Sequence, residues 1–260
     1  TPEEAESWTI GVVLEPDFLP GFSLTLDRYN IEITDAIVFI DPQDAAENCV
    51  DASGAPDPVF CSLITRDPGD FNIVFVESSY ENASKQTTKG WDLQIAYATN
   101  LADLTADTAM AFLDGDVAVS LTANKLDELR IFAFQSDPTN ENVEEGEIGD
   151  PEWSFVTDLS YRMGDLTLIW RSRYEDEVSR FAQGAGSPED YDYPYIEYVW
   201  THDFVARYNL EAATGADAEI YVGVNNAFDE EYPYGLGSSG TAAAYDIVGR
   251  YVFGGATLRF

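Results

Sequence analysis

Two cysteines are the first residues of this sequence whose type and spacing suggest chemistry. Cys49 and Cys61 are the only cysteines, and they lie close together in a polar segment. In an oxidising compartment such a pair forms a disulfide, which stabilises the enclosed loop by about 3 kcal/mol in the chain-entropy account. The alternative is a metal or redox pair, which needs further Cys or His nearby, and the sequence has none there. We therefore expect a disulfide.

The single histidine raises the question of catalysis. His202 stands beside Asp203, as in half of a catalytic dyad. However, the residues around it alternate in character, so His202 shares a face with Trp200 and Phe204 while Asp203 points the other way. We interpret His202 as an interfacial histidine. The Gly-x-Ser-x-Gly, His-Glu-x-x-His and P-loop motifs are absent, so the sequence predicts no enzyme, no catalytic residue, no resident metal and no cofactor.

Two segments rich in tyrosine and carboxylates are the candidates for ligand contact. Tyrosine rings can stack on a sugar or another planar ligand, and carboxylates can hold a cation or sugar hydroxyls. The alternative is a girdle of aromatic residues at a membrane interface, which is the commoner role of such residues. The candidate residues are Tyr191, Tyr193, Tyr195, Asp229, Glu230, Tyr232 and Tyr234.

The charge of the chain is strongly negative. There are 48 acidic and 13 basic residues, a formal net charge of -35. This argues against a nucleic-acid partner, because phosphate binding needs Lys and Arg, and it is compatible with divalent cations, cationic ligands or a salty habitat. The acids are dense from Asp137 to Glu152. We interpret that run as a solvated, self-repelling loop, with a calcium site as the alternative, although the spacing is not that of an EF-hand.

Alternating side chains show which elements must position these residues. From Trp153 to Met163 apolar residues alternate with polar ones, and the pattern resumes after the tight Gly164-Asp165 turn. A two-residue period is typical of strands with two unlike faces. Arg171 and Arg173 fall on the polar face, which in a barrel is the lumen. The chain ends on such a strand, at Phe260.

About nine strands can be counted, and the connections between them alternate in length. Short turns near 16–20, 101–116, 163–165 and 214–216 alternate with long loops near 41–70, 135–150, 178–190 and 228–244. This alternation is typical of an up-and-down antiparallel sheet with two unlike rims. The expected strands are Ser7–Glu15, Phe22–Ile40, Lys85–Thr99, Asp116–Phe134, Trp153–Met163, Asp165–Glu177, Tyr195–Leu210, Ala218–Asn225 and Asp246–Phe260.

Together these features predict an all-β, antiparallel transmembrane β-barrel. No apolar run is long enough for a spanning helix. A strand of about ten residues, tilted by about 45°, covers roughly 23 Å, close to the apolar band of an outer membrane. Nine is an odd number, whereas bacterial single-chain barrels close with an even one. We therefore expect residues 1–260 to be the C-terminal part of a larger barrel, and the absence of a signal peptide fits either a mature form or a piece of a longer protein.

Several segments resemble, in order, the TonB-dependent outer-membrane receptors. The opening Pro2–Pro16 is similar to the segment that enters the last strands of that family, and Asn30–Ile37 to the strand that follows. Val224–Pro233 resembles the penultimate-strand signature. The closing strand of the family is matched by Gly249–Phe260, with Phe260 as its C-terminal assembly signal. Between Asn30–Ile37 and the penultimate strand, Phe60–Pro68 and Asn82–Leu93 resemble the next loop and strand of the family.

The resemblance implies a 22-stranded barrel in the outer membrane of a Gram-negative bacterium, with an amino-terminal plug. In that family the TonB complex, driven by proton-motive force, remodels the plug to admit a nutrient such as a siderophore, haem, cobalamin or an oligosaccharide. The chain departs from the family because plug and TonB box are absent from it. Arg171 and Arg173 would then face the plug, whose acids are their expected partners. The other expected partners are outer-membrane lipid, TonB through the plug, and a small nutrient ligand.

Two other classes of protein remain open from sequence. One is a small complete barrel, acting as a porin or a membrane enzyme, which requires an even number of strands. The other is a secreted β-rich adhesin or lectin, which requires both faces of its sheets to be buried. No loop carries a motif tied to one ligand, so the sequence indicates no particular cargo.

Overall fold

Strands account for most of the chain. The computed structural model describes residues 2–50, 55–105, 114–132, 141–180, 187–210, 217–231 and 248–259. The long strands are β1 (Glu4–Leu14), β2 (Phe22–Ile40), β5 (Ser79–Asn100), β6 (Asp116–Phe132), β8 (Trp153–Met163), β9 (Leu166–Glu175), β12 (Val199–Asn209), β13 (Asp217–Asn225) and β14 (Tyr251–Arg259). The short elements are α1 (Pro42–Asn48), α2 (Pro58–Ser62), β3 (Ile64–Arg66), β4 (Ile73–Val76), α3 (Leu101–Thr105), β7 (Glu141–Val143), β10 (Val178–Ser179), η1 (Pro188–Asp190) and β11 (Tyr195–Ile196).

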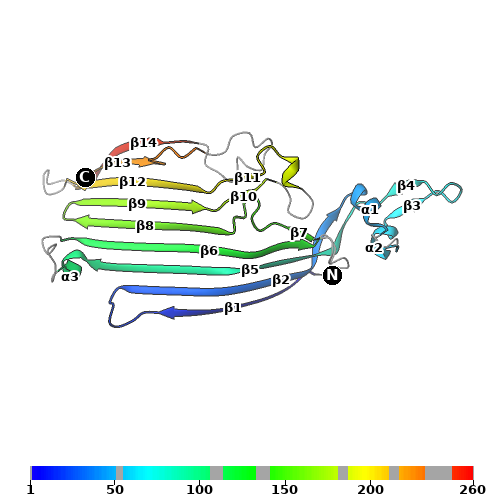
Figure 1. Ribbon diagram of the computed structural model, residues 1–260, viewed down its shortest axis with the longest axis horizontal. Helices are drawn as coiled ribbons and strands as arrows, with labels where there is room; N and C mark the ends of the chain where they lie inside the picture. Colours follow the sequence, from blue (N-terminus) through cyan, green and yellow to red (C-terminus); the bar gives the residue numbers. More distant parts are fainter. Residues whose placement is uncertain are drawn as a thin grey trace. The chain divides into compact units, whose positions relative to one another are not determined.

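The long strands form one sheet in the order in which the chain makes them. That order is β1-β2-β5-β6-β8-β9-β12-β13-β14, and β7 pairs with β6 beside this path (Figure 1). The path is up-and-down, as predicted, and its nine strands agree with the predicted number. No described helix combines the length and the apolar character needed to cross a bilayer.

The bounds of several predicted strands need correction, and β1 begins at Glu4 rather than at Ser7. β5 begins at Ser79 rather than at Lys85. Its first residues already lie beside β2, where the Asn82 side chain donates to the Asp35 carbonyl oxygen at 2.8 Å. The strand predicted from Tyr195 is two strands, β11 and β12, because β11 pairs with β10 instead of continuing along β9. The last strand, predicted from Asp246, begins at Tyr251, since the described residues 248–250 are not in a strand; residues 246, 247 and 260 lie outside the described residues.

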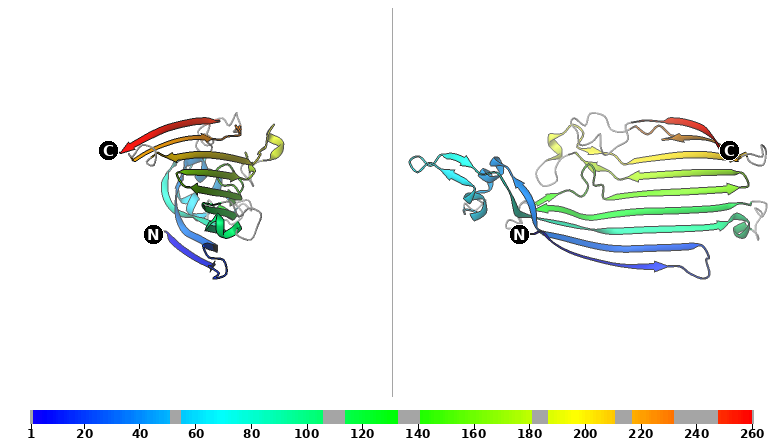
Figure 2. Two further views of the ribbon diagram at one scale, coloured as in Figure 1. Left: turned by 90° about the vertical axis from the view of Figure 1, so that its left-hand side faces the viewer. Right: turned by 180° about the vertical axis from the view of Figure 1, so that it is seen from behind.

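The residue contacts divide the chain into two compact units. We call Thr1–Glu6, Ile31–Thr87 and Arg130–Asn142 the extension unit, and Ser7–Asn30, Thr88–Leu129 and Val143–Phe260 the wall unit. Strands β2, β5 and β6 are longer than a membrane crossing needs, and each continues from one unit into the other. In the wall unit the sheet is bent into an arc, with β1 and β14 at its two edges (Figure 2).

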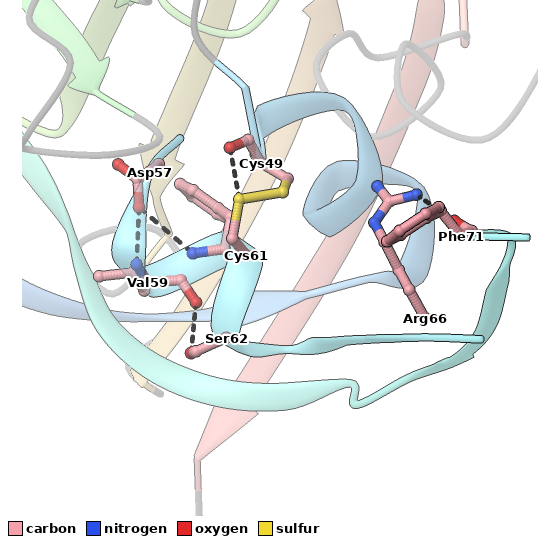
Figure 3. Close-up of a disulfide and its surroundings, with 8 residues drawn as sticks. Cys49, Asp57, Val59, Cys61, Ser62, Arg66 and Phe71 are labelled. Carbon is pink, nitrogen blue, oxygen red and sulfur yellow. Dashed lines mark hydrogen bonds between the residues drawn. A yellow bond between two sulfur atoms is a disulfide. The ribbon is translucent and has the colours of Figure 1, made fainter. Parts of the chain in front are cut away.

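The extension unit has a small core of its own. Ile40, Ala45, Cys49, Phe60 and Leu63 are buried together. Helix α2 begins where the Asp57 carboxylate accepts hydrogen bonds from the backbone nitrogens of Val59 (2.8 Å) and Phe60 (3.2 Å). The side chains of Cys49 and Cys61 form a disulfide beside this core (Figure 3).

The register of the wall unit gives the sheet one apolar face. Leu159 pairs with Trp170, Trp170 with Phe204, and Phe204 with Val224, so an apolar row crosses β8, β9, β12 and β13. Val222 on this face is 56% exposed. An apolar surface of this extent requires hydrocarbon or a protein partner.

The opposite face of the wall unit is charged. Arg171 is paired in register with Asp158 on one side and Asp203 on the other. Because side chains alternate along a strand, this charged row lies opposite the apolar row. The predicted alternation in β8 and β9 is therefore confirmed, as is the placement of His202 and Asp203 on opposite faces.

One turn between strands and one pairing of strands depend on glycine. Gly164 adopts a left-handed φ of 56° in the tight turn between β8 and β9, which a side chain would strain. On β13 and β14, Gly223 lies opposite Phe253 and Gly255 lies opposite Tyr221. Each ring covers the glycine on the neighbouring strand, and a side chain at either glycine would collide with that ring.

Candidate functional site

The long connections at one end of the wall unit are held by a small apolar cluster. β10 pairs with β11, so that Val178 lies opposite Ile196. Both side chains are buried together with Val199, and Ile148 packs against them. This cluster fixes the segment around Tyr193 and Tyr195, because that segment leads directly into β11.

A second loop is closed by one asparagine. Asn226, with a left-handed φ of 46°, follows β13 directly. Its side-chain amide donates to the Glu230 carbonyl oxygen at 2.9 Å and accepts from the Glu230 backbone nitrogen at 2.8 Å. Its own backbone nitrogen donates to Oδ1 of the buried Asp203 at 2.9 Å. The carboxylate of Asp203 therefore fixes the position of loop 226–231.

These two loops and the end of β12 surround a hollow of about 400 Å³, which we call the rim hollow. Three tyrosines, three glutamates and one arginine supply most of its lining. The residues are Arg180, Tyr193, Tyr195, Ile196, Glu197, Tyr198, Val199, Glu230 and Glu231.

The rim hollow brings together Tyr193, Tyr195 and Glu230 of the predicted contact residues. Tyr191 is exposed but does not line it. The Asp229 carboxylate accepts from the Arg250 backbone nitrogen (2.8 Å) and guanidinium (3.3 Å), which gives it a role in joining two segments of the wall unit. Two predicted contacts, Tyr232 and Tyr234, and the terminal Phe260 lie outside the described residues. Ligand contact by these residues stays a prediction.

Sequence reasoning missed six residues of the hollow, namely Arg180, Ile196, Glu197, Tyr198, Val199 and Glu231. Residues 196–199 follow the predicted Tyr195, and Glu231 follows the predicted Glu230, so proximity in sequence could have found five of the six. Arg180 could not be found in this way. It reaches the hollow because its backbone nitrogen donates to the Pro194 carbonyl oxygen at 2.9 Å, a contact set by the pairing of β10 with β11.

Aromatic side chains form a belt at the same end of the apolar face. The Tyr174 ring stacks on Phe155 at 4.8 Å and on Tyr198 at 5.8 Å between centroids. The Trp170 indole nitrogen donates to Nδ1 of His202 at 3.2 Å, and the Trp200 indole nitrogen donates to the Ser172 hydroxyl at 2.6 Å. Rings with a hydrogen-bonded polar edge are typical of a membrane interface.

The two arginines expected to face the plug are already ion-paired within the wall. Nε of Arg171 lies 2.6 Å from Oδ1 of Asp158, and Nη1 of Arg173 lies 2.8 Å from Oδ2 of Asp203. Both lie on the polar face, in agreement with the predicted alternation. Their pairing with acids of a plug stays a prediction.

The acidic segment before β8 is not simply a self-repelling loop. Glu141 forms an ion pair with Arg130 at 2.8 Å, and the Glu145 carboxylate accepts from the Leu129 backbone nitrogen at 2.8 Å, so both acids hold the segment against β6. Burial raises the pKa of the Asp150 carboxyl nearby. The described residues include no group of three or more His, Cys, Asp or Glu placed to hold a metal ion.

Replacing Asp203 with alanine is expected to loosen loop 226–231. The change removes the carboxylate that accepts from the Asn226 backbone nitrogen and that pairs with the Arg173 guanidinium. We expect the free energy of unfolding to fall by about 1–3 kcal/mol. The lower part of this range is expected because Arg173 is half exposed, so solvent weakens its ion pair with Asp203. Equilibrium unfolding in urea and proteolysis of the loop measure it. Asp158→Ala is the control, because it removes a more exposed partner; equal effects of the two changes would refute the assignment.

One family model matches most of the chain. The model described as TonB dependent receptor-like, beta-barrel, matches residues 1–227. None of the curated proteins matches the chain.

Solved structures share the fold at low sequence identity. A variant of the ferric enterobactin receptor PfeA from Pseudomonas aeruginosa matches 99% of this chain with a TM-score of 0.59 and 15% identity. The FrpB iron transporter from Neisseria meningitidis matches 98% with a TM-score of 0.57 and 16% identity, and the ferric-catecholate import receptor Fiu from E. coli K12 matches 100% with a TM-score of 0.51 and 14% identity. The chain spans only 31%, 31% and 28% of their respective lengths.

Proposed function

Since the chain belongs to the TonB-dependent receptor family, within its β-barrel, we propose that it forms part of the outer-membrane barrel of a receptor for energised nutrient uptake. The observation that carries the proposal is the register of the wall unit, with an apolar row on one face and a charged row on the other. Lipid would contact the apolar face, and the charged face would line the lumen. We assign no catalysis to the chain.

We further propose that residues 1–260 are the C-terminal portion of a barrel domain of 22 strands. Among the described strands, β1 pairs only with β2, and β14 pairs only with β13. An unpaired edge in hydrocarbon costs several kcal/mol for each unsatisfied backbone group, so both edges need further strands. The plug of the same receptor would occupy the lumen, and the TonB complex would act through that plug.

The rim hollow is the proposed ligand contact of this chain. It lies at the end of the wall unit where the connections are long, and such loops on a rigid scaffold commonly carry specificity. The cargo would be a small scarce nutrient, with siderophores, cobalamin and oligosaccharides as the classes that the family suggests.

The proposal is tested by fractionating cells that express the full-length receptor. We expect the receptor in the outer-membrane fraction, migrating faster on gels before boiling than after it, and cross-linking to TonB in cells with an intact plug. A plug-deleted receptor is the control and should lose the TonB cross-link while staying in the membrane. A protein that remains dissolved without detergent would instead indicate an adhesin or lectin, and ion conductance without TonB would indicate a porin.

A further inference from the structure

We propose that the rim hollow selects a zwitterionic ligand, which places an anionic group at Arg180 and a cationic group at the glutamates opposite. The inference rests on the proposed function, because it concerns the cargo that the receptor admits. It depends on the charges and rings that the described residues bring to one hollow.

Arg180 supplies the reason for an anionic group. Its Nε is buried and has no hydrogen-bond partner among the described residues. A buried guanidinium N–H group without an acceptor is unfavourable, and a carboxylate that accepts from it would relieve that cost. The wall arginines differ, because Arg171 and Arg173 each have an acidic partner within 3 Å.

Three carboxylates supply the reason for a cationic group. Glu197, Glu230 and Glu231 line the same hollow, so its charged side chains are one positive and three negative. A ligand with negative charge alone would gain from Arg180 and be repelled by all three carboxylates. A ligand that also carries an ammonium or guanidinium group is attracted by both sets of charges.

The tyrosines set the shape of the ligand between its two charges. Tyr193 is 74% exposed, so its ring offers a surface for stacking, whereas one face of the Tyr198 ring is already stacked on Tyr174. Aromatic faces also attract cations. The volume of about 400 Å³ lies at the lower end of the range for small-molecule sites, so the hollow fits an amino acid or a short peptide-like group.

The test measures binding of defined zwitterions to the purified full-length receptor by titration calorimetry. The probes are tyrosine and the dipeptide tyrosyl-tyrosine, each with one amino group and one carboxylate, and each is compared with its carboxyl-amidated form and with its N-acetylated form. We expect saturable binding of tyrosine or tyrosyl-tyrosine, and at least tenfold weaker binding after either modification, because each modification removes the only cation or the only carboxylate of the probe. Arg180→Gln should weaken the zwitterion at least tenfold and remove the difference between the free acid and the amide.

Matched variants make the result specific to the hollow. Glu230→Gln combined with Glu231→Gln should remove the difference between the free and the acetylated amine while keeping the preference for the free carboxylate. Arg66→Gln is the control, because Arg66 lies in the extension unit, where it donates to the Phe71 carbonyl oxygen, and it should leave binding unchanged.

The inference is overturned if no probe binds saturably, or if the amidated and free forms bind equally. Because binding is measured in detergent, this outcome is separate from the membrane fractionation and TonB cross-linking above. A receptor that passes those tests and ignores the zwitterions refutes the inference alone. A protein found outside the outer membrane refutes the proposed function instead.

Discussion

Leu159→Arg is expected to lower the stability of the receptor by about 2–4 kcal/mol, the cost of a charge on the lipid face near the middle of the bilayer. Leu159 lies in the middle of β8 on the apolar face, between Val119 and Trp170 on the neighbouring strands. An arginine there has no water to solvate it and no acid beside it in the apolar row. Urea unfolding of the full-length receptor in lipid vesicles measures the loss, and a smaller folded fraction on unboiled gels should accompany it.

The neighbouring residue provides the matched control. Ser160 lies at nearly the same depth in β8 but on the polar face, opposite Ala118 and Ile169. Ser160→Arg should therefore cost less than about 1 kcal/mol, since the lumen side of a barrel is polar. Equal costs for the two substitutions would show that hydrocarbon does not cover the apolar face, and the membrane assignment would fail with it.

Removal of the disulfide is expected to destabilise the extension unit by about 3 kcal/mol while leaving the wall unit intact. Cys49 and Cys61 close a loop that contains the N-cap of α2, and both lie at a small core with few buried side chains (Figure 3). The double change Cys49→Ala and Cys61→Ala should make the extension unit sensitive to protease at temperatures where the wild type resists. Mass spectrometry of the fragments shows which unit is cut.

Reduction of the wild-type protein is the control for this double change. Dithiothreitol should reproduce its protease pattern, and it should have no further effect on the variant. If the variant stays as resistant as the oxidised wild type, the buried residues Ile40 and Phe60 hold the unit without help from the disulfide.

Strand count, strand order and the two faces could be read from the sequence because each depends on local periodicity. In β8 and β9 most residues of one face are apolar and most of the other are polar, and the register confirms these two faces, although Val156 and Ile169 lie on the polar face. The bounds of β8 were predicted to the residue, since Trp153 follows a proline-containing acidic loop and Met163 precedes the Gly164 turn.

The extension unit and the rim hollow could not be read in this way. Helices α1 and α2 are too short for a helical period to stand out, and they depend on a core that joins Ile40 to Phe60. The hollow depends on the pairing of β10 with β11, two strands of two residues each. Arg180 is brought to the hollow only by that pairing, so no pattern in the neighbouring sequence predicts its position there.

The exchange of rings and glycines between β13 and β14 restricts how the last hairpin can be assembled. A slip of two residues would set Phe253 against Tyr221, so that two rings would compete for the space that one ring and one glycine now share. The opposite slip would pair Gly223 with Gly255, so that neither ring would have a glycine opposite it to cover. The steric fit therefore favours the native register of the hairpin over both slips.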